Sequence, residues 1–138
     1  MAGQFDKAEN TLMKVLDITP DDPLALNNLA YMYLENNKNY SKAIDLVNQA
    51  LEAEPDNGAY LDTLGWAYYL KGNYKKARKN IEKALKVANE VDKGVIYKHY
   101  GDILVKLGKT NDAIDAYNSA VEYGEDETGI TSKIKSLE

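Results

Sequence analysis

The sequence contains no cysteine and only three prolines among its 138 residues. Without cysteine the chain can form no disulfide, no thiolate zinc site and no thiol nucleophile. The scarcity of proline and the lack of any low-complexity tract argue against disorder, because 44% of the residues are hydrophobic and can build a core. No apolar run is long enough to span a bilayer, so we expect no membrane insertion. Residues 1–20 read as a polar amphipathic helix, and no signal peptide is visible in them.

The chain is also poor in histidine and offers few candidate catalytic or metal-binding residues. Its net charge is −5, and an acidic chain binds phosphate backbones poorly unless its basic residues cluster, so we expect no nucleic-acid partner. The single histidine, His99, lies three residues before Asp102, and we interpret the two as an exposed pair on one helix face. A hydrolytic site would also need a nucleophile, an oxyanion hole and a pocket. Two-histidine metal motifs and glycine-rich phosphate loops are absent. The sequence predicts no catalytic residue, no metal and no cofactor.

Small residues recur along the chain at an interval of about 35 residues, which indicates an internal repeat. Three sets share this spacing: Ala30, Gly65 and Gly101; Ala43, Ala77 and Ala113; and Ala50, Ala84 and Ala120. Within each copy, large apolar residues return every three or four positions in two separate stretches, as on amphipathic helices. Lys71-Gly72-Asn73 divides two such stretches and reads as a tight turn. The repeated unit is therefore predicted to be a helical hairpin.

This repeated pattern resembles that of the tetratricopeptide repeat (TPR) family, whose repeat contains Leu-Gly, a tyrosine, an alanine, a further large residue and a closing proline. The central copy carries Leu61, Leu64-Gly65, Tyr68, Ala77 and Ile81, with Asn89 in place of the proline. The copy before it carries Leu26, Leu29-Ala30, Tyr33, Ala43, Val47 and Pro55. The copy after it carries Tyr97, Tyr100-Gly101, Leu104, Ala113 and Tyr117, with Glu125 in place of the proline. The resemblance covers nearly the whole chain.

The resemblance implies an all-α fold, a right-handed superhelical solenoid of antiparallel helix pairs. One TPR-like array over 1–138 would hold a leading half repeat at 3–18, about three full repeats at 22–55, 57–89 and 92–124, and a C-terminal capping helix at 126–138. Helices are expected at 22–36, 40–54, 57–71, 74–89, 92–107 and 110–123, with Asp22 and Asp56 as candidate N-caps. Gly65 and Ala77 should lie where the two helices of a hairpin come closest, and Ala84 where successive hairpins meet.

The segment 3–18 matches only the second helix of a repeat and lacks a first-helix partner. We therefore expect it to keep an apolar face exposed, and such faces are typical of interaction sites. Association of copies through this helix is a structural alternative to ligand binding.

In arrays of this kind the first helices line a concave groove, so the resemblance implies a partner-binding surface there. The positions that the packing pattern leaves unused are Asn27, Tyr31, Leu34 and Glu35; Asp62, Trp66, Tyr69 and Leu70; and Lys98, Asp102, Val105 and Lys106. Tyr68 already fills the core position of the packing pattern, so this pattern does not require Trp66 and Tyr69. Together with Tyr31 they would form an aromatic shelf that anchors a peptide or helix. The alternative is that these rings pack against neighbouring helices of the array.

The sequence thus predicts a non-enzymatic protein-interaction scaffold whose partner is a peptide or helical segment. Some TPR proteins grip a peptide carboxylate, but Tyr31 and Trp66 replace polar clamp residues here, and Asn28, Thr63 and His99 form no cationic set. A basic run comprises Lys71, Lys75, Lys76, Arg78, Lys79, Lys83 and Lys86. We interpret it as a solvated face, with docking of an acidic partner as the alternative. The lysine-rich, arginine-poor composition resembles that of bacterial members, and the compartment stays open between cytoplasm and bacterial envelope.

Overall fold

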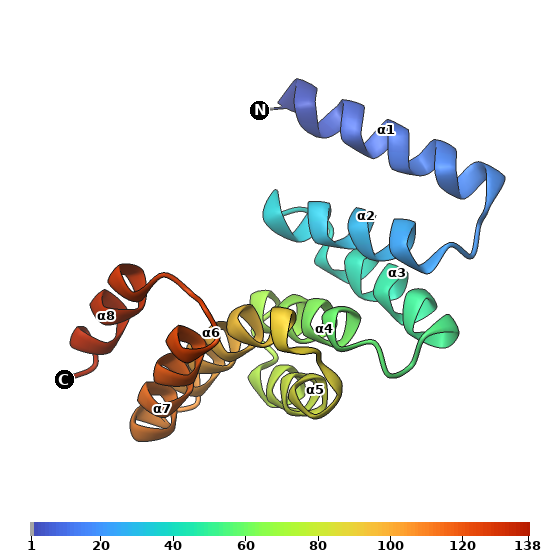
Figure 1. The fold of residues 1–138 in the computed structure, drawn as a ribbon. Helices are drawn as coiled ribbons and strands as arrows, with labels where there is room; N and C mark the ends of the chain where they lie inside the picture. Colours follow the sequence, from blue (N-terminus) through green and yellow to red (C-terminus); the bar gives the residue numbers. More distant parts are fainter. Residues whose placement is uncertain (1) are drawn as a thin grey trace.

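Eight helices joined by short turns make up the computed structural model over residues 2–138, the part of the chain that the structure describes. They are α1 (Ala2–Ile18), α2 (Pro23–Glu35), α3 (Tyr40–Ala53), α4 (Gly58–Leu70), α5 (Tyr74–Val87), α6 (Glu90–Lys106), α7 (Thr110–Glu122) and α8 (Glu127–Lys135). Figure 1 shows the helices following one another along an arc, with the two termini at its ends. The all-α solenoid expected from the sequence is confirmed.

Antiparallel neighbours along the chain form the hairpins of this array. The most extensive contacts join α2 with α3, α4 with α5, and α6 with α7, and smaller contacts join each hairpin to the next. Helices α2, α4 and α6 also touch one another in succession. In Figure 1, α3, α5 and α7 lie on the outer side of the arc, while α2, α4 and α6 lie on its inner side. The inner surface is therefore built from the first helix of each hairpin.

The turns inside the hairpins need residues that accept a positive φ angle. Gly72 has φ +85° and Gly108 has φ +75°, and the amide of Gly72 donates to the Tyr69 carbonyl at 2.9 Å, which closes the end of α4. Glycine adopts this left-handed conformation without steric cost. The first hairpin has one additional residue at its turn and uses Asn37 and Asn39, with φ values of 55° and 47°. Asparagine is among the few other residues that tolerate this region.

Asparagine also begins several helices. The side chains of Asn57, Asn73 and Asn89 accept hydrogen bonds from backbone amides in the first turns of α4, α5 and α6. This satisfies amides that have no partner within the helix. The prediction of Asp56 as a cap was therefore wrong by one residue, and α6 begins at Glu90 rather than at 92. Asp22 occupies the N-cap position of α2 without a side-chain hydrogen bond, with proline at the start of the helix.

Helices approach most closely where the sequence repeats its small residues. A Cβ atom on Gly65 would lie 2.7 Å from Cγ1 of Ile81 and 3.2 Å from the carbonyl oxygen of Ala77. Both distances are shorter than ordinary van der Waals contact, so a side chain on Gly65 would push α4 and α5 apart. Ala77 and Ala84 are fully buried, and Ala84 belongs to a core cluster that spans α4, α5 and α6. The predicted seams are therefore present.

The two end helices cover the core from opposite sides. On α1, Phe5 is buried against Tyr33 of α2, and Leu12 and Leu16 pack on the same cluster. On α8, Ile130 is buried in the cluster formed with α6 and α7. Three apolar side chains of α1 remain in solvent: Met13, Val15 and Ile18, of which Ile18 is 85% exposed. At 100° per residue Val15 and Ile18 lie about 60° apart, whereas Met13 lies about 140° or more from both, so the exposed apolar face that the sequence predicted is limited to Val15 and Ile18.

The seam at Gly101 offers a direct test of this packing. A Cβ atom there would lie 2.5 Å from Cδ1 of the buried Tyr117 ring, whose hydroxyl is held by Asp102. Gly101→Ala gains about 1 kcal/mol of helix propensity, but overpacking costs about 1–3 kcal/mol. Because the ring cannot retreat into solvent, we expect a net loss of about 1 kcal/mol in the free energy of unfolding, measured by urea denaturation.

Gly129→Ala is the matched control, since a Cβ atom there meets nothing closer than Asp126 Oδ2 at 4.0 Å. The control should leave stability unchanged or slightly higher. A Gly101→Ala protein at least as stable as the parent would contradict the close approach of α6 and α7.

Candidate binding surface

The inner side of the arc carries a stack of three rings contributed by α4 and α6. Trp66 and Tyr69 lie three residues apart on α4, so they share one helix face, and their ring centroids are 4.5 Å apart with planes 12° from parallel. His99 of α6 lies on the other side of Trp66, with centroids 4.1 Å apart and planes 21° from parallel. Trp66 is therefore sandwiched but remains half-buried, so part of its indole still faces solvent.

His99, the ring at one end of the stack, is anchored by the buried carboxylate of Asp62. His99 Nδ1 lies 2.8 Å from Asp62 Oδ1, and both side chains are nearly enclosed. An ionised carboxylate can only accept a hydrogen bond, so Nδ1 of His99 carries the proton and donates it. The prediction of an exposed pair between His99 and Asp102 was wrong. His99 turns toward α4 instead, where it fills the seam between two first helices.

Asp102 has partners on the two helices that follow α6. Its Oδ1 accepts a hydrogen bond from the hydroxyl of Tyr117 on α7 and, at 2.9 Å, from Nζ of Lys133 on α8. Burial of the Tyr117 hydroxyl, together with its bond to Asp102, raises the pKa of this tyrosine well above its usual value. Asp102 therefore ties the C-terminal helix to the inner surface, and little of its carboxylate is free to meet a ligand.

Other predicted surface residues divide between solvent and core. Tyr31 on α2 is 41% exposed and Glu35 is exposed, whereas Leu34 is only 2% exposed and belongs to the core between α2 and α3. The placement of Leu34 and Asp62 on an open surface was therefore wrong. Leu34 packs because the last turn of α2 lies against α3, and Asp62 is covered by His99. Tyr69 and Leu70 are half-buried.

Partial burial and nearby carboxylates raise the pKa values of Tyr31 and Tyr69 above that of a free tyrosine. Desolvation raises the pKa of Tyr31, and the charges of Glu35 and Asp62 raise it further. Desolvation likewise raises the pKa of Tyr69, with a smaller contribution from Asp102. Both hydroxyls therefore stay protonated at neutral pH and can donate hydrogen bonds to a ligand.

The C-terminal part of the inner surface is polar. Lys98 of α6 lies 3.2 Å from Glu125, and both residues line a cleft of about 210 Å³ between α6 and α8 together with Lys133. Val105 is half-buried and Lys106 is exposed, near the end of α6. At the opposite end, Asn27 of α2 is partly buried, and its Oδ1 has no hydrogen-bond partner within the described residues. Polar groups thus flank the aromatic rings on both sides.

The inner surface offers side chains suited to contact with a ligand. Within residues 2–138, no three His, Cys, Asp or Glu side chains are grouped so that they could hold a metal ion. None of the helices in this described part combines the length and the hydrophobicity that crossing a membrane requires. What the inner surface does offer is a band of half-exposed rings with hydroxyl donors, set on a rigid base.

Sequence reasoning missed the contacts of His99 and Tyr117 because it treated each helix alone. Asp62 and His99 are 37 residues apart, close to one repeat length, so they come from neighbouring positions on successive first helices. A comparison of near-equivalent positions in successive repeats could have predicted this contact. The hydrogen bond between Tyr117 and Asp102 could not be predicted from the repeat spacing in the same way, because it joins the two helices within one hairpin.

Comparisons with known proteins agree with this architecture. A sequence model described as tetratricopeptide repeat matches residues 21–90 and 59–126. A TPR repeat-containing protein of Methanocaldococcus jannaschii is 32% identical over 116 residues, which cover 83% of this chain but only 20% of that protein. The chain thus spans about a fifth of the length of that relative.

Two solved structures are similar in fold. The crystal structure of MamA superposes with a TM-score of 0.80 at 20% identity and covers 99% of this chain and 78% of its own. The first TPR of Spaghetti (RPAP3), bound to the HSP90 peptide SRMEEVD, gives a TM-score of 0.74 at 21% identity, over 83% of this chain and 89% of its own.

The link between Asp62 and His99 can be tested by a double-mutant cycle. His99→Phe keeps a ring against Trp66 but leaves the Asp62 carboxylate buried without its partner, and Asp62→Ala removes the acceptor. Each single variant should lose about 1–3 kcal/mol of unfolding free energy in urea titrations. The double variant should lose clearly less than the sum, with a coupling of about 1 kcal/mol. Additive losses would show that the two side chains do not support each other.

Proposed function

The chain belongs to the tetratricopeptide repeat family, and on that premise we propose that it is a non-enzymatic scaffold that holds a segment of a partner protein against its inner surface. The observation that carries the proposal is the aromatic shelf, which we define as Tyr31, Trp66 and Tyr69. Tyr31 is 41% exposed on α2, while the other two rings are half-buried on the adjacent α4. Side chains of this kind combine apolar area with a polar tip, which suits the capture of a peptide or helix.

The rigidity of the shelf supports the same conclusion. Trp66 is held between Tyr69 and His99, and His99 is in turn fixed by its bond to the buried Asp62. A surface whose side chains are already ordered loses little conformational entropy when a ligand arrives. The stacked rings therefore provide a preorganised platform rather than loose side chains that a ligand would have to immobilise.

The charges around the shelf bear on which segment it would hold. The similar RPAP3 structure contains a peptide with two glutamates and an aspartate near its end. Here Lys98 and Lys133 are already paired with Glu125 and Asp102 of the same chain. A terminal carboxylate would have to compete with these carboxylates for the cations. We therefore propose that apolar and aromatic side chains of the partner, rather than a terminal carboxylate, make the main contacts with the shelf.

Peptide selection tests this function directly, because a random library contains segments of every chemistry. A displayed library of random peptides would be enriched on the parent protein, and the affinities of the selected peptides would be measured by fluorescence anisotropy. We expect Tyr31→Ala and Trp66→Ala each to weaken binding by about 1 kcal/mol or more, as expected when an anchor ring is removed.

Tyr40→Ala is the matched control, because this tyrosine lies at the start of the outer helix α3. Urea denaturation of each variant would separate loss of binding from loss of folding. Peptides that bind the two shelf variants as tightly as the parent, or a library that yields no binder, would contradict the proposal.

A second candidate function, self-assembly, is favoured by the exposed apolar face of α1. Val15 and Ile18 are both exposed and lie about 60° apart around the helix, outside the face that packs on α2. Burying such a face against a second copy would remove apolar area from water at about 25 cal/mol per Å². Here the array would act structurally, with copies associating through their N-terminal helices.

Light scattering at increasing concentration tests self-assembly. The parent should gain apparent mass as concentration rises, and Val15→Glu with Ile18→Glu should keep it monomeric, because two carboxylates would then have to be buried. Lys109→Glu is a control that changes the net charge by the same amount but lies at the exposed turn between α6 and α7, away from α1. A parent that stays monomeric at high concentration would eliminate self-assembly through α1.

A further inference from the structure

The outer helix α5 carries a stripe of lysines that the proposed inner-surface function does not use. Its 14 residues hold six basic side chains against one acidic one, a net charge of +5 in a chain whose total is −5. At 100° per residue, five of the lysines fall within an arc of about 100°, and this arc points away from the buried Ala77, Ile81 and Ala84. These five residues, the α5 stripe, are Lys75, Lys76, Lys79, Lys83 and Lys86, and all are exposed.

The α5 stripe is not neutralised by its own chain. Arg78 pairs with Glu82, the only acidic residue of the helix, and none of the five lysines forms an ion pair with any residue in 2–138. Lys75, Lys79 and Lys83 are spaced by four residues, so like charges face each other along the helix. Each such pair costs a few tenths of a kcal/mol. The stripe therefore destabilises the isolated helix slightly, and an anionic partner would relieve that repulsion.

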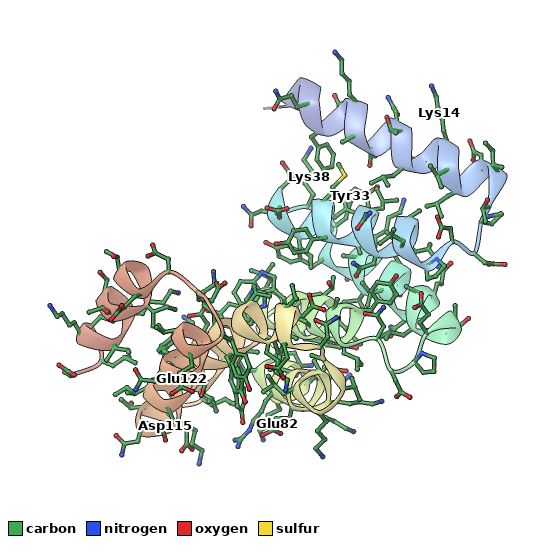
Figure 2. All side chains as sticks on the ribbon, viewed as in Figure 1. Lys14, Tyr33, Lys38, Glu82, Asp115 and Glu122 are labelled. Atoms are coloured by element: carbon green, nitrogen blue, oxygen red, sulfur yellow. The ribbon has the colours of Figure 1, made fainter. Side chains whose placement is uncertain are left out.

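The neighbouring outer helices limit the shape of that partner. Asp45 and Glu52 are exposed on α3, and Asp115 and Glu122 are exposed on α7. Figure 2 labels the two residues of α7. The α5 stripe itself is one helix wide, about 10 Å, and about 16 Å long, and the exposed Lys71 just before α5 extends the basic surface toward α3. A broad anionic surface, such as a membrane or a nucleic-acid duplex, would bring its phosphates against the acidic side chains on both flanks. A partner with a single row of carboxylates, lying along α5, would contact only the lysines of the stripe.

We propose that the α5 stripe docks an acidic segment of a partner protein, with carboxylates spaced along one face of a helix so that they match the lysines. Lysine suits this task because its ammonium group is a point charge on a flexible stem and can reach carboxylates at several positions. The site lies on the outer side of the arc and is independent of the aromatic shelf on the inner side.

A defined probe tests this surface. The probe is an alanine-based labelled peptide of about 16 residues, with glutamates spaced by four, four and three residues, as Lys75, Lys79, Lys83 and Lys86 are. Binding would be followed by fluorescence anisotropy at low and at moderate salt, with a glutamine version of the peptide as blank. We expect binding by the parent that weakens as salt rises, because the charges are exposed to solvent.

Charge reversal within the stripe should remove most of this affinity. Lys79→Glu with Lys83→Glu should weaken binding about tenfold or more, since each change replaces an attraction by a repulsion. Lys7→Glu with Lys14→Glu alters the net charge of the protein equally but lies on α1, and it should weaken binding less than about twofold. Lys79→Gln with Lys83→Gln should fall between the two, and it keeps the test valid if the reversed variant folds poorly.

Three outcomes would overturn the proposal. The first is no measurable binding of the glutamate peptide at low salt. The second is equal weakening by the α5 and α1 charge reversals, which would reveal a general charge effect. The third is that anionic phospholipid vesicles or a short DNA duplex bind as tightly and depend on Lys79 and Lys83 as strongly, because the surface would then recognise phosphate rather than a carboxylate row.

Discussion

The close approach of paired helices at glycine and alanine is the contact on which the rest of the molecule depends. A Cβ atom at Gly65 or Gly101 would come within 3 Å of a buried side chain on the partner helix. Because these seams lie at equivalent positions in successive repeats, each hairpin closes with nearly the same geometry, and the stack curves regularly (Figure 1). Helix separation then decides which side chains enter the core and which stay on the two faces of the arc.

Polar contacts hold the inner surface together in addition to apolar packing. The buried pair of Asp62 and His99 joins α4 to α6 in successive hairpins. Asp102 joins α6 to Tyr117 within one hairpin and to the exposed Lys133 of α8. A buried polar pair stabilises only when its partners are correctly placed, since an unsatisfied group costs more than the bond contributes. The pair of Asp62 and His99 therefore helps to specify how α4 and α6 of successive hairpins are arranged, and with it the position of the Trp66 ring that stacks on His99.

Most of the fold could be read from the sequence, because it is written in local patterns. The spacing of small residues identified the seams, and the periodicity of apolar residues placed the helices to within a few residues. The wrong predictions of exposure concern a polar residue that contacts the next repeat and an apolar residue in the last turn of α2. Leu34 and Asp62 were expected in the open, yet one is core and the other is covered by His99. Periodicity shows which face of a helix is apolar, but not which neighbouring side chain closes over a polar position.

The two surfaces should respond differently to solution conditions because their chemistry differs. The rings of the inner side gain free energy by leaving water, a contribution that salt screening does not reduce. The lysines of α5 interact through exposed charges. At physiological ionic strength, salt largely screens interactions between such charges when they are more than about 8 Å apart. Helices α4 and α5 form one hairpin, with the rings on the first helix and the lysines on the second, separated by the seam at Gly65 and Ala77. The two proposed binding surfaces therefore share no residue, and a partner on one side would not compete for side chains of the other.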